Sequence, residues 1–460
     1  MDRLEDCRGP AASYPGAFWD GKTWNRETLR DFCQPWREAQ ATGRPIHVGE
    51  FGCYNKKTDT ILTTNHLPDL TSRLQTELTE NILPFWLNHA PDRANGGFYG
   101  AISNSLEVDN TAPRSAILCA RILWTFSCAY RHFDKAEYRQ MADYAYAALT
   151  GPFWDDEYGG VYWSLNPDNT PLEPRKHHYA QAFAIYGLSE YFRATQNKHA
   201  KQLACQLFDL LETHAFEPLH GGYTEGSSRD WGALDDMRLS DKDLNCRKSM
   251  NTLLHILEAY TNLLRIWDEP RLRTQHRQLL ETYLEKVYTP QTGHLRLFFD
   301  DAWNSLEDLD SYGHDIEASW LMWEAAGMHP NPSLHERIRP AVLGLAESVL
   351  REGRDSDGSL FYEGRAGKII VDEKHWWPQA EAMVGFANAY ELTGDRKFAA
   401  AESEAWRFIE NYLIDPLHGD WFKETNRAGN PNPSHAKAGF WDCPYHHARA
   451  CFELLERSAR

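Results

Sequence analysis

The sequence predicts an all-α protein, an (α/α)6 barrel with short β-hairpins between its helix pairs. Two observations lead to this prediction. A glycine followed by an aromatic, strand-like run recurs six times, at intervals of 61 to 71 residues. Between these markers, apolar residues recur at the spacing of amphipathic helices. A period of this length indicates one supersecondary unit that is repeated along the chain.

The six markers predict six hairpins. Glycine accepts the positive φ angle of a tight turn, and the aromatic residues that follow it favour strands. The markers start at Gly97, Gly160, Gly222, Gly293, Gly358 and Gly419.

The helical pattern predicts twelve helices between and beside these hairpins. They are expected at residues 68–88, 112–132, 136–149, 177–195, 198–214, 248–267, 271–288, 313–326, 333–352, 376–393, 396–413 and 440–457. One early helix, five pairs and one late helix make six pairs if the ends meet, which favours a closed ring over an open solenoid. Residues 115–130 carry one charge, Arg121, and are expected to form an inner helix, whereas residues 134–146 begin with charged residues and are expected to form an outer one.

The first sixty residues do not share the repeat. Residues 43–52 form a short β-like run that ends in Gly-Glu-Phe-Gly. This run resembles the strand that carries the nucleophile in family 5 glycoside hydrolases, with Glu50 in the nucleophile position. Such a barrel needs at least about 200 residues, and a glycosidase needs a second carboxylate. We therefore expect residues 1–60 to be a non-catalytic appendage and linker, and residues 61–460 to be the barrel domain.

Composition excludes several classes of partner. Lysine and arginine number 48 and aspartate and glutamate 66, which gives a net charge of −18 and argues against nucleic acid and anionic membranes. The sequence predicts no membrane span and no secretory signal. Nine cysteines without a C-x-x-C pair indicate reduced thiols in a cytoplasmic protein, which we expect to be a monomer.

Histidines recur at the predicted starts of the inner helices. Because all inner helices of a closed barrel begin at one end, these side chains are expected to converge on one mouth of the central cavity. The set comprises His177, His178, His255, His314, His375, His446 and His447.

Such a set suits proton abstraction beside a carbonyl group, because imidazole has a pKa near neutral pH. Glu317 lies one helical turn from His314 and is expected to orient its ring. Arg121 and a neutral His255 are expected to hydrogen-bond the oxygens of an enediolate. Two histidines on opposite walls are then needed to invert one carbon. No H-E-x-x-H motif, phosphate-binding loop or dinucleotide fingerprint is present, so no metal and no cofactor are expected.

Five motifs, in order, resemble the N-acylglucosamine 2-epimerase superfamily over residues 65–460, and most closely its cellobiose 2-epimerase branch. They are Ala120-Arg121-Ile-Leu-Trp124, Asn251-Thr-Leu-Leu-His255, Gly313-His314-Asp-Ile-Glu317-Ala-Ser-Trp320, Lys374-His375-Trp376-Trp377-Pro378-Gln379-Ala-Glu381 and Trp441-Asp-Cys-Pro444-Tyr445-His446.

The resemblance implies an (α/α)6 barrel that epimerises C2 of the reducing glucose of β-1,4-linked disaccharides through a cis-enediolate, without a cofactor. It implies that His314 and His446 are the general acid/base pair and that Arg121 and His255 surround the C1 and C2 oxygens. It also implies that Glu317 is the partner of His314. The positions implied to contact sugar are Tyr179, Asn251, Trp320, Trp376, Trp377, Glu381 and Trp441.

Three other functions stay open at this stage. One is a monosaccharide epimerase or an aldose–ketose isomerase of the same fold. Another is a glycoside hydrolase, for which Glu317 and Glu381 are the candidate carboxylates, about 6.5–9.5 Å apart if the enzyme inverts. The last is a non-catalytic sugar-binding module.

Overall fold

The computed structural model describes residues 69–459, which form one compact unit. The predicted appendage at residues 1–60 lies outside the described residues. The helices are α2 (Leu70–Thr76), α3 (Leu83–His89), α4 (Ala116–Phe133), α5 (Ala136–Thr150), α6 (His178–Thr195), α7 (Lys198–His214), α8 (Met250–Leu264), α9 (Pro270–Thr282), α10 (Tyr312–Ala326), α11 (Pro332–Ser348), α12 (Trp376–Thr393), α13 (Arg396–Phe408) and α14 (Tyr445–Ser458). Four π-helical segments continue outer helices: η2 (Glu77–Ile82), η3 (Tyr283–Val287), η4 (Val349–Gly353) and η5 (Ile409–Leu413).

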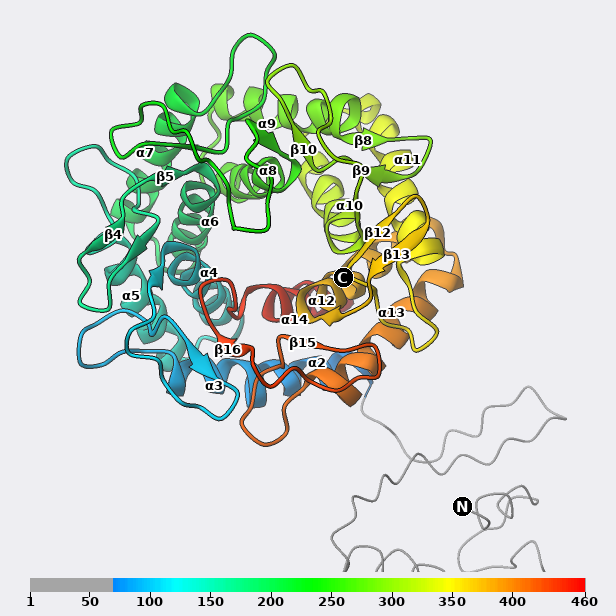
Figure 1. Cartoon of the computed structure of the whole chain (residues 1–460), viewed down its shortest axis with the longest axis horizontal. Coiled ribbons are helices and arrows are strands. Elements are labelled where there is room, and N and C mark those ends of the chain that lie inside the picture. The colour runs from blue at the N-terminus through cyan, green and yellow to red at the C-terminus, as the bar shows by residue number, and fades with distance from the viewer. Residues whose placement is uncertain (1–68, 460) are drawn as a thin grey trace, which may run out of the picture. The chain divides into compact units, whose positions relative to one another are not determined.

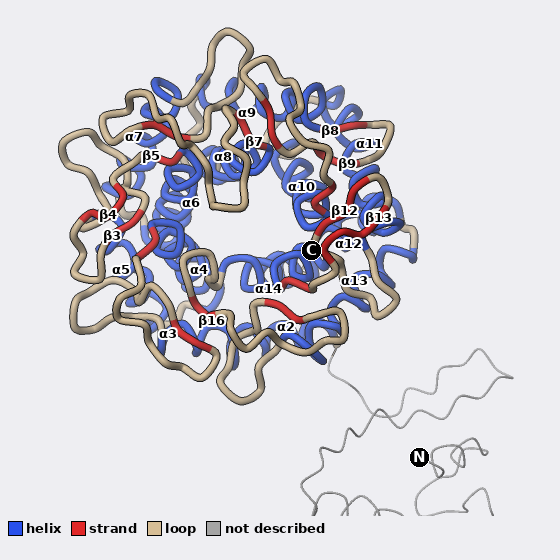
Figure 2. The backbone as a smooth tube through the Cα atoms, viewed as in Figure 1, coloured by secondary structure: helices blue, strands red, loops and turns tan. Residues whose placement is uncertain are grey.

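The strands are short and all lie in the connections between helices (Figure 2). They are β1 (Ile102–Ser103), β2 (Arg114–Ser115), β3 (Ser164–Leu165), β4 (Pro171–Glu173), β5 (Lys176–His177), β6 (Gly226–Ser227), β7 (Lys248–Ser249), β8 (Tyr288–Thr289), β9 (His294–Leu295), β10 (Phe298–Phe299), β11 (Asp310–Ser311), β12 (Glu363–Arg365), β13 (Lys368–Val371), β14 (Lys374–His375), β15 (Glu424–Thr425) and β16 (Ala436–Ala438).

The helices form two concentric rings (Figure 1). The inner ring is α4, α6, α8, α10, α12 and α14, each packed on the next, and α14 packs on α4 and closes the ring. Strand β1, in the first connection, also pairs with β16, in the last one. The ring is therefore closed by the connections between helices as well as by the helices. The prediction of a closed (α/α)6 barrel is therefore confirmed, and the open solenoid is wrong. The predicted helix positions agree closely with the observed ones. The exception is the last helix, which was expected to begin at residue 440 and begins at Tyr445, because Pro444 precedes it.

The inner helices are more deeply buried than the outer helices, as the charge pattern predicted. Helix α4 is buried along nearly its whole length, including Arg121, whereas α5 buries only one face. Neighbouring inner helices approach at glycines. A Cβ atom on Gly187 of α6 would lie 2.7 Å from the Ala120 carbonyl oxygen of α4, so only glycine fits there.

Each hairpin follows an outer helix and is tied to the start of an inner helix. All six marker glycines have positive φ, as predicted. In five repeats, a cation in the strand before the inner helix pairs with a carboxylate at the hairpin; the pairs are Arg114–Asp92, Lys176–Asp155, Lys248–Glu217, Lys374–Asp355 and Lys437–Asp415. The fourth repeat has Asp310 in that strand, and His294 pairs instead with Asp315 of α10. These ion pairs fix the inner-helix starts at one end of the barrel.

Within residues 69–459, no helix is both long enough and apolar enough to cross a membrane. The six cysteines in this part of the chain are all free thiols.

Candidate active site

Three histidines from three inner helices lie near one another, and each is held through its Nδ1 atom. His255 Nδ1 lies 2.9 Å from Glu258 Oε2, His314 Nδ1 lies 2.7 Å from Ser311 Oγ, and His446 Nδ1 lies 2.7 Å from Glu381 Oε1. Among residues 69–459, the Nε2 atoms of these three rings have no hydrogen-bond partner. Each ring therefore has one fixed nitrogen and one nitrogen that is free to meet a substrate.

His314 and His446 both lie near one indole ring. The ring centroid of Trp377 lies 4.8 Å from that of His314 and 5.5 Å from that of His446. Trp376 meets His446 edge-on at 6.3 Å. The two predicted acid/base residues therefore share one aromatic neighbour, at the same end of the barrel.

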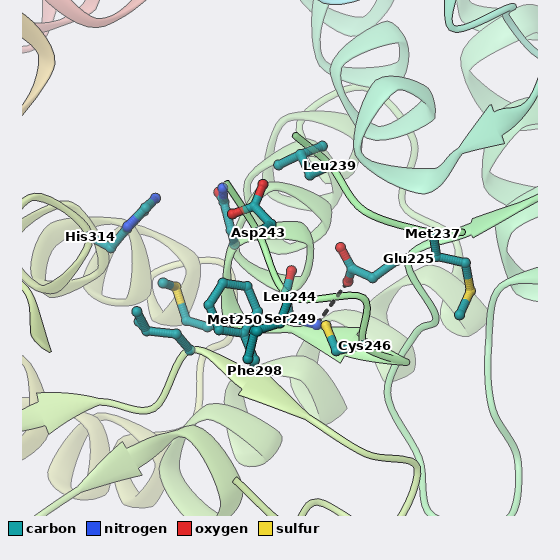
Figure 3. Close-up of a pocket in the computed structure, with 12 residues that line it drawn as sticks. Glu225, Met237, Leu239, Asp243, Leu244, Cys246, Ser249, Met250, Phe298 and His314 are labelled. Carbon is teal, nitrogen blue, oxygen red and sulfur yellow. Dashed lines mark hydrogen bonds between the residues drawn. The ribbon is translucent and has the colours of Figure 1, made fainter. Parts of the chain in front are cut away.

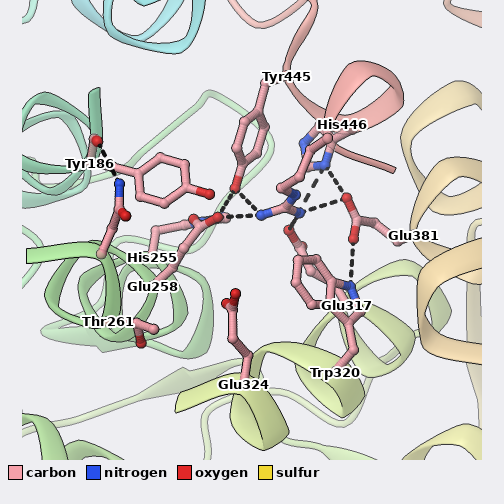
Figure 4. Close-up of polar contacts among 12 residues, drawn as sticks. Tyr186, His255, Glu258, Thr261, Glu317, Trp320, Glu324, Glu381, Tyr445 and His446 are labelled. Atoms are coloured by element: carbon pink, nitrogen blue, oxygen red, sulfur yellow. Dashed lines mark hydrogen bonds and ion pairs between the residues drawn. The ribbon is translucent and has the colours of Figure 1, made fainter. Parts of the chain in front are cut away.

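A cluster of buried charged side chains contacts His446 (Figure 4). Arg449, one turn further along α14, donates from Nη2 to Glu317 Oε1 and to Glu381 Oε1, each at 2.6 Å. Its Nη1 donates to Glu258. One guanidinium thus joins the carboxylate that holds His446 to the carboxylate that holds His255.

This cluster corrects three expectations. Glu317 does not orient His314, because its carboxylate points to Arg449 and the partner of His314 is Ser311. Glu381 is not a sugar contact: both of its oxygens are occupied, by His446 and Arg449 on one side and by the indole N–H of Trp320 on the other. Trp320 is likewise no stacking surface, because its side chain is 1% exposed and lies under the guanidinium of Arg449.

Arg121 is a second buried guanidinium, and it lacks a carboxylate partner among the described residues. Its Nη2 donates to Tyr179 Oη at 2.8 Å, and its planar face lies over the rings of Phe183 and Tyr445. The Nε atom is buried and unpartnered. Because a buried charge is costly unless it is paired, Arg121 is suited to bind a group that develops negative charge.

A pocket opens beside His314 (Figure 3). Polar side chains of Asn251, Asp243 and Glu225 line it together with apolar residues such as Phe298. Asn251 Oδ1 is buried and unpartnered, which suits a hydroxyl donor. Glu225 accepts from the Ser249 backbone N–H at 2.8 Å, so it fixes the start of the helix that carries Asn251. Trp441, in the loop before α14, packs edge-on against Tyr179 and stays partly exposed.

The remaining predicted histidines serve the fold rather than the site. His177 contacts the Met237 carbonyl and His178 contacts Ser227 Oγ, so both rings are used in the connections. His375 stacks on Tyr362 at 3.9 Å. His447 turns to Asp420 Oδ1 at 2.7 Å, away from the cluster that holds His446.

The cluster of Glu317, Glu381 and His446 has the residue types of a metal site, with one ligand atom from each residue within 4.8 Å of the others. The guanidinium of Arg449 already lies 2.6 Å from both carboxylates. A metal cation would have to displace or repel it. These residues therefore do not favour a metal, and the expectation of no metal and no cofactor stays a prediction.

The cluster retains a proton at neutral pH because three carboxylates surround one guanidinium. Burial, and then the charge of Glu381, raise the pKa of Glu317 to about 8. Burial and the charges of Arg121 and Arg449 lower the pKa of His446. At neutral pH the proton therefore lies on Glu317 and His446 is a neutral base, with 3.8 Å between Glu317 Oε1 and His446 Nδ1. Burial also lowers the pKa of His314, so both rings are neutral at neutral pH, the form that can accept a proton.

We expect the raised pKa of Glu317 to make stability depend on pH. In the unfolded chain this carboxyl has its ordinary pKa of about 4.5, so between that pH and about 8 the folded state holds the extra proton. The free energy of unfolding therefore falls as the pH rises through this window. Glu317→Gln, which cannot ionise, should weaken that fall. Denaturant unfolding of both proteins at about pH 5, 6.5 and 8 measures the difference, and identical slopes would contradict the assignment.

Sequence reasoning missed Arg449, Glu258 and Ser311. Two of these follow their histidine by three residues, Glu258 after His255 and Arg449 after His446. The same one-turn spacing that suggested Glu317 would have found them. Ser311 precedes its helix and gives no comparable signal.

Comparisons with known proteins identify the family of this chain. The model of the N-acylglucosamine 2-epimerase (GlcNAc 2-epimerase) family matches residues 97–450. The chain belongs to the N-acylglucosamine 2-epimerase family. A cellobiose 2-epimerase of Bacteroides fragilis is 47% identical to this family member over 387 residues, 84% of this chain and 98% of that protein.

Solved structures place this 2-epimerase family member in the same fold. The structure of cellobiose 2-epimerase from Bacillus thermoamylovorans B4167 is 41% identical and covers 84% of this chain and 99% of its own, with a TM-score of 0.80. A D-mannose isomerase structure, 21% identical with a TM-score of 0.74, shares the fold.

The hydrolase interpretation fails on geometry. Its two candidate carboxylates, Glu317 and Glu381, lie within 4.8 Å of each other at their nearest ligand atoms, closer than the about 6.5–9.5 Å of an inverting pair. Both are buried and bonded to Arg449, so they cannot flank a glycosidic bond.

Proposed function

We propose that this chain is a cellobiose 2-epimerase, which reversibly inverts C2 of the reducing-end glucose of β-1,4-linked disaccharides. Cellobiose would give glucosyl-mannose, and lactose would give epilactose. The observation that carries the proposal is the pair of imidazoles, His314 and His446, which both lie beside Trp377 and are both held at Nδ1 with Nε2 free. The relatives named cellobiose 2-epimerase, which share up to 47% of their residues with this chain, support the same substrate class.

The geometry accounts for a two-base reaction. The sugar ring opens to the aldehyde, and one histidine removes the C2 proton through its free Nε2 atom. Electrons from the C2–H bond form the C1–C2 double bond of a cis-enediolate, whose oxygens Arg121 can stabilise. Rotation about C2–C3 turns the other face of C2 to the second histidine. That histidine, which has taken up a proton from solvent at Nε2, gives it to C2, where electrons of the C1–C2 double bond form the new C2–H bond. The ring then closes with C2 inverted.

The residues assigned to the sugar divide into two groups. Trp376 and Trp377 offer ring surfaces near His446, and Trp441 offers one beside Tyr179. Tyr179 and Asn251 offer polar atoms. A sugar needs both, because its C–H faces stack on flat rings and its hydroxyls need hydrogen bonds. We assign these five residues to substrate binding.

The decisive experiment is incubation with cellobiose in deuterated water. We expect glucosyl-mannose that carries deuterium at C2, because the second histidine delivers a hydrogen that it has taken from the solvent. Chromatography separates the products and proton NMR locates the label. Mannose and N-acetylglucosamine, assayed in parallel, test the monosaccharide alternative. Faster turnover of either sugar than of cellobiose would overturn the substrate assignment, and release of glucose would indicate hydrolysis.

A further inference from the structure

The imidazole of His294 joins two carboxylates that belong to different elements of the fourth repeat. Its Nδ1 atom lies 2.7 Å from Asp315 Oδ2, and its Nε2 atom lies 3.2 Å from Glu352 Oε2. His294 is a buried residue of β9, whereas Asp315 belongs to α10 and Glu352 to η4, at the end of an outer helix. An ionised carboxylate only accepts hydrogen bonds, so both ring nitrogens need a proton. The contacts of these three residues, which we call the His294 bridge, therefore require an imidazolium.

The surroundings of the His294 bridge are mainly acidic, which favours this charge. Burial alone would lower the pKa of the imidazole, but Asp315, and then Asp310 and Glu352, raise it to about 9. Burial raises the pKa of Asp315, whereas the imidazolium and the Leu295 N–H, 2.9 Å from Asp315 Oδ1, favour its ionised form. The other polar groups around the ring come from β8, α10, α11 and η4; they are the hydroxyls of Tyr288, Tyr312 and Ser348 and the guanidinium of Arg351, which pairs with Glu352.

The His294 bridge holds the start of the helix that carries His314. Asp315 follows His314 in the sequence, in the first turn of α10. One oxygen of Asp315 is bonded to the His294 ring and the other to the Leu295 N–H, so β9 fixes the residue next to His314. The five other repeats use lysine or arginine for the comparable ion pair. Because an imidazole ordinarily has a pKa of about 6.5, the cation of the fourth repeat exists only with the help of its two carboxylates.

We propose that His294 is a positioning residue for His314, and that the loss of its proton sets the alkaline limit of epimerisation. Deprotonation passes one ring proton to hydroxide and leaves a neutral imidazole with a single N–H group. Asp315, the nearer carboxylate, keeps that N–H but loses its countercharge, and Glu352 then faces a nitrogen lone pair, which repels it. A buried carboxylate without its countercharge is costly, so Asp315 and the adjacent His314 are no longer held in place.

The buried ring can exchange its proton with water. A surface pocket of about 390 Å³ is lined by His294 together with residues of β8 and of the loop before α10. This pocket gives the proton a path to solvent. The inference rests on the proposed function, because it takes His314 as an acid/base residue.

The pH dependence of kcat for cellobiose tests the proposal, with an enzyme-free blank for base-catalysed rearrangement of the sugar. The wild-type kcat should fall as the pH rises through about 9. His294→Gln, which carries no charge, should lower kcat at neutral pH by about 10–100-fold, because a displaced catalytic group loses its alignment with the substrate. Its KM should change little, since the five residues assigned to the sugar lie outside α10, and its kcat should lack the alkaline fall. His294→Lys keeps a cation in the bridge and should move the fall to higher pH.

Glu352→Gln distinguishes a positioning role from a merely structural one. It removes the partly exposed carboxylate of the bridge and leaves Asp315 in place, so the fall in kcat should move to lower pH. This variant also decides the question if His294→Gln does not fold. His220→Gln is the matched control: the exposed His220 lies 3.2 Å from Glu217 in another hairpin, and its variant should keep the wild-type profile. An alkaline fall that is identical in the wild type and in the folded bridge variants would overturn the proposal.

Nuclear magnetic resonance of isotopically labelled histidine tests the bridge independently of the proposed function. Both ring nitrogens of His294 should carry a proton at neutral pH, and one should lose it as the pH rises through about 9. Over the same range, hydrogen exchange of the Leu295 amide should accelerate beyond the intrinsic effect of pH, because its acceptor Asp315 is released. A singly protonated ring at neutral pH, or a Leu295 amide that stays equally protected, would refute the positioning role. If the wild type does not epimerise cellobiose, the proposed function fails, and these two measurements still decide whether the bridge opens.

Discussion

Alanine in place of His314 or of His446 should reduce epimerisation of cellobiose by about 10²–10⁴-fold and leave the fold intact. Each ring supplies one free Nε2 atom, and neither is the sole partner of a buried charge. Loss of His446 leaves Glu381 bonded to Arg449 and Trp320, and loss of His314 frees only the Ser311 hydroxyl. Product chromatography gives the rates, and circular dichroism with thermal unfolding gives the fold.

Isotope exchange makes this prediction sharper. Each variant keeps one base, so each should exchange the C2 hydrogen of only one epimer with deuterated water, and the two variants should act on opposite epimers. His447→Ala is the matched control, because His447 faces Asp420 and is expected to leave epimerisation unchanged. Substantial epimerisation in both of the first two variants would refute the two-base assignment.

Arg449→Met should cause the largest loss of stability. The guanidinium is 1% exposed and bonds three carboxylates, those of Glu258, Glu317 and Glu381. Methionine fills a similar volume but leaves those groups without their cation. Breaking a buried ion pair in this way costs about 3–5 kcal/mol of unfolding free energy. Denaturant unfolding near pH 7 measures the loss.

A surface arginine provides the comparison. Arg139 pairs with Asp143 across one turn of α5, with both side chains more than a third exposed. Arg139→Met should cost less than about 1 kcal/mol, because water already solvates both charges. If the two substitutions proved equally mild, the cluster around Arg449 would not be the electrostatic centre described above. Acidic conditions should narrow the gap between them, since protonated carboxyls need no cation.

The fold was predictable because its signals repeat. Each of the six hairpins has a glycine for the same physical reason, because the backbone takes a positive φ angle there. This glycine recurs once in each repeat. Inner and outer helices differ in charge because only the inner ones are buried on all sides, as α4 and α5 illustrate. Local sequence signals predicted the ends of the helices less accurately. Pro444 moved the start of the last helix to Tyr445 and left Trp441 in a loop.

The site was predictable as a set of residues but not as a set of contacts. One-turn spacing on a helix suggested that Glu317 orients His314, yet the carboxylate of Glu317 turned to Arg449 of another helix. The partner of His446 is Glu381, 65 residues away, and no local pattern can reveal such a pair. The pKa of Glu258, the partner of His255, likewise depends on the position of Arg449, which lies on another helix.

The last inner helix has a consequence for biosynthesis. Helix α14 both completes the ring against α4 and carries His446 with Arg449. Among the helices of residues 69–459, the ribosome makes α14 last, so a nascent chain that has assembled α4 to α12 has neither a closed ring nor the histidine to which we assign one proton transfer. The ring and the proposed site are therefore completed together, and we expect a chain truncated before Tyr445 to be inert rather than slow.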